Sequence, residues 1–372
     1  MKSGPSTQPN LLPVRSPVRR LYAEHYLLIT LLSFAGSVTL TRLFLNLTGF
    51  PQLGGGGLHI AHVLWGGLLL FVAALFPLIL ANRWALDVSA FLSGVGVGLF
   101  IDEVGKFITQ QNNYFFPAAA PIIYSLFLIT LLIYTLVRRK QDLDSRHSSY
   151  LVLEQLEDVI DRDLSESEKN EITHHLKTIK KQNQEPSLVS LSNSLTRYLQ
   201  SKNISLVPER LVWWQKIERK WENFENKTFT RPIHRFIMII GIFLWGVWAI
   251  AHSLLSLYYS LNKIALSEVA SELINNHLPL STSGIGLAEV RIGMEVLAGL
   301  FLIIACFLFI IRKERLASQV SVVTFLFSIC VIYLMVFYYE QFSSIFYALI
   351  QFLLLMITLR YRNRFLTPQL TK

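Results

Sequence analysis

Charged residues are scarce in this sequence of 372 residues. Asp, Glu, Lys and Arg together make up 16% of it, whereas a soluble domain carries about a quarter. Hydrophobic residues account for 52%, and they collect in uninterrupted runs that are long enough to cross a bilayer. The shortage of charge excludes an ordinary soluble domain and predicts a multi-pass integral membrane protein surrounded by a lipid bilayer.

Cysteine and the familiar catalytic motifs are also scarce. The two cysteines, Cys306 and Cys330, lie inside apolar runs, so they predict no disulfide framework and are interpreted as small apolar residues of the bundle. The sequence has no HExxH zinc motif, and the four glycines at Gly54–Gly57 lack the spacing of a phosphate-binding loop. Known motifs therefore assign no reaction to the chain.

Eight apolar runs are predicted to span the membrane. They cover residues 26–47, 58–80, 86–109, 118–137, 236–258, 292–311, 320–337 and 342–359. Each run is long enough for a membrane helix, and a polar stretch separates the fourth from the fifth. We predict an all-α fold, a polytopic membrane helix bundle of about eight transmembrane helices with a cytoplasmic helical insertion.

These runs divide the chain into five parts. They are a disordered basic cytoplasmic tail (1–24), spans one to four (25–137), a cytoplasmic helical insertion (138–235), spans five to eight (236–361) and a second cytoplasmic tail (362–372). The first run is too long for the core of a signal peptide, and no small-residue cleavage site follows it. We therefore expect the N-terminal tail to be retained.

The net charge of +9 is explained by where the basic residues lie. Most gather beside the ends of apolar runs, which predicts membrane orientation and argues against a nucleic-acid partner. Only four fall on the opposite side in this arrangement, namely Arg42, Lys106, Lys263 and Arg291. We expect the inner (plasma) membrane of the cell, with both termini cytoplasmic.

The insertion is predicted to contain short amphipathic helices. They cover residues 150–162, 165–181, 187–202 and 208–224. Leu153, Leu156, Val159 and Ile160 form an apolar stripe on the first, and Ser165 with Glu168 is typical of a capping box at the start of the second. We expect a helical hairpin through which residues 138–235 bind a second copy of the chain or another protein.

Ionisable residues at the predicted outer end of spans two and three mark the candidate site. These residues are His59, His62, Asp102, Glu103 and Lys106. Because Gly94 and Gly98 would let helices approach closely, we hypothesise that Gly66 packs at the level of Gly98, which brings His62 level with Asp102. Further candidates at the same depth are Arg42, His252, Arg291 and Glu295. Ionisable groups within a membrane usually face a bundle interior, so we predict one polar chamber that opens outward.

Several interpretations of these residues remain open. His59 and His62, with Asp102, have ligand types that suit a metal ion or haem, but they also suit a proton relay or simple polar contacts at the membrane interface. Lys106 lies one turn from both Asp102 and Glu103 and would neutralise one of them. Arg291 and Glu295 are expected to pair with each other. His252 is expected to be a hydrogen-bonded residue inside the helix bundle.

Two segments also resemble a known family. LHIAHVLWGGLLL and GLFIDEVGKFITQQNNYFFPAAAPIIY, within about Gly54–Tyr124, resemble an uncharacterised family of bacterial multi-pass integral membrane proteins. The resemblance implies a membrane protein but no activity, because that family has no assigned function.

Three classes of function are compatible with these features. We favour binding or sensing of a small ligand or ion in the outer chamber. One alternative is a membrane-embedded metal- or haem-dependent enzyme that uses His59 and His62 with Asp102 or Glu103, so whether the protein is an enzyme is left open. The other is an ion or proton-coupled transporter, against which the inner halves of the spans carry almost no charge.

Overall fold

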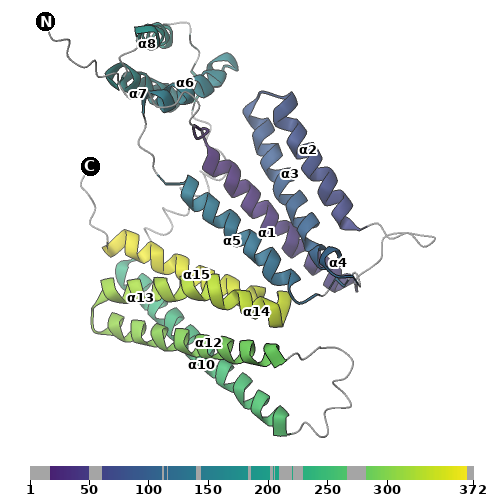
Figure 1. The fold of residues 1–372 in the computed structure, drawn as a ribbon. Helices are drawn as coiled ribbons and strands as arrows, with labels where there is room; N and C mark the ends of the chain where they lie inside the picture. The colour runs from purple at the N-terminus through teal and green to yellow at the C-terminus, as the bar shows by residue number, and fades with distance from the viewer. Residues whose placement is uncertain are drawn as a thin grey trace, which may run out of the picture. The chain divides into compact units, whose positions relative to one another are not determined.

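The computed structural model describes residues 17–49, 61–110, 113–114, 116–139, 144–182, 186–201, 204, 206–208, 220, 229–265 and 282–366. Within these ranges the regular structure is helical, apart from one isolated bridge between Ser165 and Val207 (Figure 1). The predicted all-α polytopic bundle is confirmed.

The described elements follow one another in a simple order. They are α1 (Ala23–Thr48), α2 (His62–Ile79), α3 (Arg83–Asp102), α4 (Val104–Ile108), α5 (Ala119–Val137), α6 (Ser145–Ile160), α7 (Glu166–Gln182), α8 (Pro186–Leu199), α10 (Arg231–Ala265), α12 (Thr282–Ile310), α13 (Glu314–Phe327), the π-helix η1 (Ser328–Ile332), α14 (Tyr333–Glu340), the 3-10 helix η2 (Gln341–Ser344), α15 (Ile345–Tyr361) and the π-helix η3 (Arg362–Leu366).

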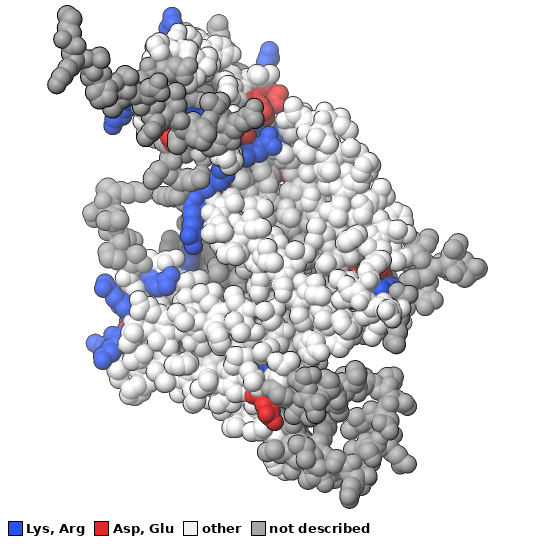
Figure 2. Space-filling view, in the orientation of Figure 1, with Lys and Arg blue, Asp and Glu red and all other residues white. Residues whose placement is uncertain are grey.

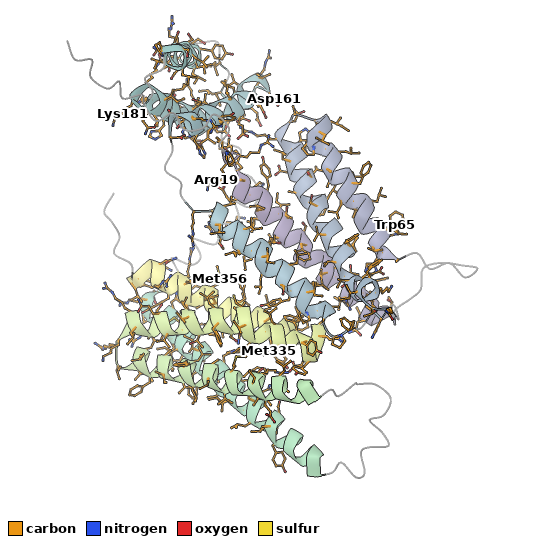
Figure 3. All side chains as sticks on the ribbon, in the orientation of Figure 1. Arg19, Trp65, Asp161, Lys181, Met335 and Met356 are labelled. Carbon is orange, nitrogen blue, oxygen red and sulfur yellow. The ribbon has the colours of Figure 1, made fainter. Side chains whose placement is uncertain are left out.

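Eight helical stretches are long and apolar enough to cross a membrane, as predicted. Their outer surfaces carry large apolar side chains such as Trp65 on α2 and Met356 on α15, which are 55% and 49% exposed (Figure 3). Figure 2 shows few charged atoms on the visible surface of these helices. Such surfaces are favourable in hydrocarbon and not in water, so the chain is a multi-pass membrane protein.

Several predicted span boundaries differ from the structure by a few residues or more, and two of these differences have a clear physical reason. The third span was expected to continue to residue 109, but α3 ends at Asp102 because Glu103 leaves the helical conformation, with φ −91° and ψ 9°. The fifth span was expected to begin at residue 236, but α10 begins at Arg231. Pro232 explains the earlier start, because proline is well tolerated in the first turn of a helix.

Contacts divide the chain into two units, and the first consists of residues 1–98 and 130–216. A Cβ atom added at Gly98 would lie 2.7 Å from Ser37 Oγ, and one at Gly96 would lie 2.9 Å from the carbonyl oxygen of Gly66. The hypothesis that Gly66 packs at Gly98 is therefore wrong. The Gly94 and Gly98 stripe faces serines at the same four-residue spacing on α1, and α2 packs against the neighbouring face at Gly96.

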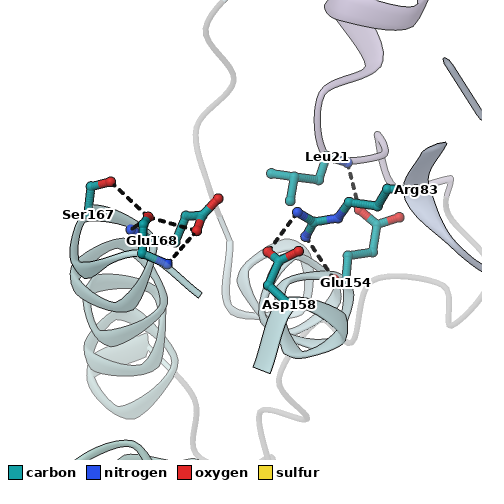
Figure 4. Close-up of polar contacts among 7 residues, drawn as sticks. Leu21, Arg83, Glu154, Asp158, Ser167 and Glu168 are labelled. Atoms are coloured by element: carbon teal, nitrogen blue, oxygen red, sulfur yellow. Dashed lines mark hydrogen bonds and ion pairs between the residues drawn. The ribbon is translucent and has the colours of Figure 1, made fainter. Parts of the chain in front are cut away.

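The helices α6, α7 and α8 share a small apolar core. Its buried members are Val152, Leu164, Ile172, Leu176, Ile179 and Leu199. Ser165 Oγ accepts a hydrogen bond from Glu168 N, and Glu168 Oε2 accepts one from Ser165 N, so the predicted capping box is confirmed (Figure 4). The predicted stripe on α6 was partly wrong, because Leu153 and Ile160 are exposed. The fourth predicted helix lies almost entirely outside the described residues.

The helix α6 is bonded to the ends of the membrane helices of its own unit. Arg83 Nη1 lies 2.7 Å from Asp158 Oδ2, and Leu21 N donates to Glu154 Oε2 at 2.7 Å (Figure 4). Burial raises the pKa of Asp158 to about 6, and this effect exceeds the lowering of that pKa by the positive charge of Arg83. The contact therefore includes a carboxylate that ionises in the weakly acidic range.

The second unit consists of residues 99–129 and 217–372. Its main body is formed by α10, α12, the α13–η1–α14 span and α15, which pack around an apolar core that includes Ile242, Leu302 and Phe309. A Cβ atom added at Gly246 would lie 3.1 Å from the carbonyl oxygen of Gly299, so glycine allows α10 and α12 to pack closely. This close pair of helices forms one wall of the cavity in the second unit that is described below.

Candidate functional site

Three of the predicted site residues lie together where α3 gives way to α4. Asp102 and Glu103 are 0% and 1% exposed. Lys106 Nζ lies 2.9 Å from Glu103 Oε1, which confirms the predicted neutralisation, and the Tyr114 hydroxyl donates to Asp102 Oδ2 at 2.7 Å. A Cβ atom at Gly105 would lie 2.8 Å from the carbonyl oxygen of Asn113. The cluster thus joins the helix break to the segment before α5.

The remaining residues of the predicted chamber belong to the other unit or lie outside the described residues. His62 and Arg42 belong to the first unit, whereas Asp102, Glu103 and Lys106 belong to the second, and His59 lies outside the described residues. Among the residues that are described, no three His, Cys, Asp or Glu side chains are grouped so that they could hold a metal ion. The metal or haem site at His59, His62 and Asp102 stays a prediction.

Three of the four further candidates, His252, Arg291 and Glu295, lie in a second polar cluster, at the end of the second unit where α14 stops. Arg291 Nε lies 2.9 Å from Glu295 Oε1, so the predicted pair is confirmed, and Arg291 Nη2 lies 2.5 Å from Glu340 Oε1. Ser253 Oγ donates to Glu295 Oε2 at 2.8 Å. Arg291 is 9% exposed, so one buried guanidinium joins two carboxylates from different spans.

Aromatic side chains continue from this cluster into the unit. His252 stacks on Trp248 with ring centroids 4.9 Å apart, and Trp248 lies 4.7 Å from Tyr347 and 4.8 Å from Trp245. Arg291, Glu295 and Glu340 line the same cavity as these rings. Its volume is about 30 Å³, which is enough for one or two water-sized occupants.

Two polar groups that line the cavity have no hydrogen-bond partner within the described part of the chain. They are Gln351 Oε1 and Trp245 Nε1, on side chains that are 5% and 7% exposed. A buried polar atom without a partner costs about 1–3 kcal/mol. Because one is an acceptor and the other a donor, the cavity is suited to a polar occupant.

The π-helix η1 forms part of the same wall. Tyr333 N donates to the carbonyl oxygen of Ser328, five residues earlier, which widens the turn. The Tyr124 hydroxyl of α5 donates to the carbonyl oxygen of Ile329 at 2.8 Å. Short π-helical segments inside α-helices are frequently found at functional sites.

Polar groups are also present at the opposite end of this unit. Glu314 Oε2 accepts from Arg231 Nη2 at 2.9 Å and from the Tyr361 hydroxyl at 3.0 Å. Between this cluster and the cavity, buried hydroxyl side chains follow one face of the span: Ser318, Ser321, Thr324 and Ser328. The argument against transport, that the inner halves of the spans carry almost no charge, was therefore incomplete, because it did not consider hydroxyl groups.

Sequence reasoning missed Ser253, Trp245, Trp248 and Gln351. Trp and Ser are common in membrane helices, so nothing in the local sequence distinguishes these positions. Two signals were available, namely the amide of Gln351 within an apolar run and the hydroxyl residues three or four apart from 318 to 328. A helical polar stripe inside an apolar segment indicates a face directed into the bundle.

Comparison with known proteins adds no identification, because no family model, curated protein or solved structure matches the chain. The resemblance of residues 54–124 to a bacterial family stays a prediction. Function is therefore argued from the cavity of the second unit.

Proposed function

We propose that the protein binds a small polar ligand or ion in the cavity between α10, α12, α13–α14 and α15. The observation that carries this proposal is the pair of unsatisfied polar atoms, Gln351 Oε1 and Trp245 Nε1, in the cavity wall. With basic residues on the cytoplasmic side, the Glu340 end of the cavity lies toward the outside of a bacterial inner membrane. The binding site thus lies among the further candidates rather than at spans two and three.

We infer that the protein also senses this ligand, with α5 as the connection. Tyr124, near the start of α5, bonds to the cavity-lining π-helix. At the other end of α5, Arg19 donates hydrogen bonds to the carbonyl oxygens of Val137, the last residue of the helix, and of Arg139, which follows it. Arg20 and Leu21, between Arg19 and α1, are bonded to Glu154 of α6. Exposed Leu153 and Ile160 on α6 support binding of a second copy or another protein there.

Substitution of Gln351 by Met tests the binding proposal. Met has a similar length but no polar group. Gln351→Met should therefore increase the free energy of unfolding of the ligand-free protein by about 1–2 kcal/mol and raise its melting temperature. The measurement is thermal unfolding of purified protein in lipid nanodiscs. A lower melting temperature would mean that the amide has a structural role, and the proposal would then fail.

Transport is a second candidate because of the buried hydroxyl groups from Ser318 to Ser328. They extend from the cavity toward Glu314, in the direction that a solute would follow. Flux of ammonium, K⁺ or Na⁺ into vesicles containing the protein should exceed flux into empty vesicles and should fall in Thr324→Val. Equal flux with and without protein would exclude transport of these ions.

A further inference from the structure

We propose that the ligand of the second-unit cavity is a single water-sized monovalent cation, ammonium or an alkali metal ion. This inference rests on the proposed binding function and specifies the chemistry of the ligand. It follows from the charges of the cavity, from its unsatisfied atoms and aromatic rings, and from its size.

The charges of the cavity wall favour a cation. Among the described residues of the wall, two carboxylates, Glu295 and Glu340, are bonded to one guanidinium, Arg291, so these three side chains together carry a formal charge of −1. The other ionisable side chains described in the wall are His252, Tyr333 and Tyr347, and in their neutral forms they do not change this charge. Because a net charge within a membrane is costly, a bound cation would stabilise the cluster.

The unsatisfied atoms and the aromatic rings fit the same ligand. The amide oxygen Gln351 Oε1 can accept a hydrogen bond from ammonium or coordinate an alkali ion. The ring of Tyr347, which also lines the cavity, can attract positive charge through its π-system. Trp245 Nε1 is a donor, so its partner is a water oxygen in the shell of the cation, which is possible because the cavity of about 30 Å³ has room for one or two water-sized occupants.

Other ligand classes fit less well. The two carboxylates would repel an anion. A divalent ion requires several oxygen ligands at short distance, but both oxygens of Glu295 already accept hydrogen bonds from Arg291 and Ser253. Larger organic cations exceed the volume of the cavity.

A cation titration of the full-length protein tests this inference. Protein in nanodiscs is kept in N-methyl-glucamine chloride, which is replaced by NH₄Cl, KCl or NaCl at constant ionic strength, while the melting temperature and tryptophan fluorescence are recorded. At least one of these cations should give a saturable rise in melting temperature. Gln351→Met should weaken its apparent affinity about tenfold, and Glu295→Gln should abolish the response.

Glu314→Gln is the matched control, because Glu314 is also bonded to arginine in the same unit but does not line the cavity. It should keep the wild-type response. A response to ammonium alone identifies ammonium, and a response to K⁺ or Na⁺ identifies an alkali ion. If the folded wild type responds to none of them, the cation class is wrong; the binding function then still stands if Gln351→Met stabilises the protein. If Gln351→Met and Glu295→Gln both keep the full wild-type response, the cation binds outside this cavity and the proposal is wrong.

Discussion

Arg291 is the side chain that connects the polar groups of the second unit. It is almost fully buried and lies within 2.9 Å of one carboxylate and 2.5 Å of another. A buried pair of opposite charges contributes little net stability, but removal of one partner leaves a charge that neither water nor protein compensates. The contribution of Arg291 to stability is therefore best measured with a variant that lacks its guanidinium group.

Arg291→Met should destabilise the protein by about 3–5 kcal/mol, because Glu295 and Glu340, which are only partly exposed, would lose the cation bonded to both. Thermal unfolding in nanodiscs measures the effect. Arg315→Met removes an exposed arginine at the other end of the unit and should change the melting temperature little. Equal melting temperatures for the two variants would show that the carboxylates do not depend on Arg291.

Asp158 should make the stability of the first unit depend on pH. Its pKa in the folded protein, about 6, is above the ordinary value of 3.8, so the folded state binds more protons than the unfolded state between these values. The stabilisation from this group is complete below about pH 4 and is lost as the pH rises through 6.

The melting temperature of the wild type should therefore fall between pH 5 and pH 7.5, and Asp158→Asn should reduce this fall. Asp163→Asn changes an exposed acid nearby and should behave like the wild type. If Asp158→Asn keeps the full pH dependence, the titrating group is another residue.

At the scale of elements, the π-helix η1 sets the direction of the groups that follow it. Its wide turn accommodates one more residue than an α-helical turn, and Glu340 lies on the helix that continues from it, α14. The orientation of Glu340 toward Arg291 therefore depends on the number of residues that separate it from η1.

Deletion of Met335 removes one residue from the regular α-helix α14 and should rotate Glu340 by about 100° relative to η1. Glu340 would then turn away from Arg291, and the protein should melt at a lower temperature and lose its cation response. Deletion of Val331 is the control, because the wide turn of η1 already accommodates one extra residue and can close to an α-helical turn that keeps Glu340 in place. A Met335 deletion variant with wild-type melting and cation response would show that the register of this span does not orient Glu340.

For the whole molecule, the number of spans followed directly from the sequence because each span is one continuous apolar run. Pairs within one helix turn, such as Arg291 with Glu295 and Ser165 with Glu168, were also predictable, since helix geometry brings them together. Contacts between helices were not. Hydropathy contains no information on how each helix is rotated, so Gly66 was assigned to the wrong level and Gln351 was not related to Glu295.

The predicted orientation has a direct test in cells. With both native cysteines replaced, Gln341→Cys should react with a membrane-impermeant maleimide in intact cells, because it would lie outside. Lys181→Cys should react only after the membrane is permeabilised, because α7 would be cytoplasmic. The opposite labelling pattern would reverse the topology and place the cavity mouth at the cytoplasmic face.

The hydrogen bond from Tyr124 to Ile329 also has a consequence for biosynthesis. Its partners are separated by 205 residues, and ribosomes add about 5–20 residues per second. Tyr124 therefore enters the membrane roughly 10–40 s before its acceptor has been synthesised. Until then its hydroxyl must be bonded elsewhere, for example to water in the insertion machinery, so the first part of α5 completes its packing only when the last spans arrive.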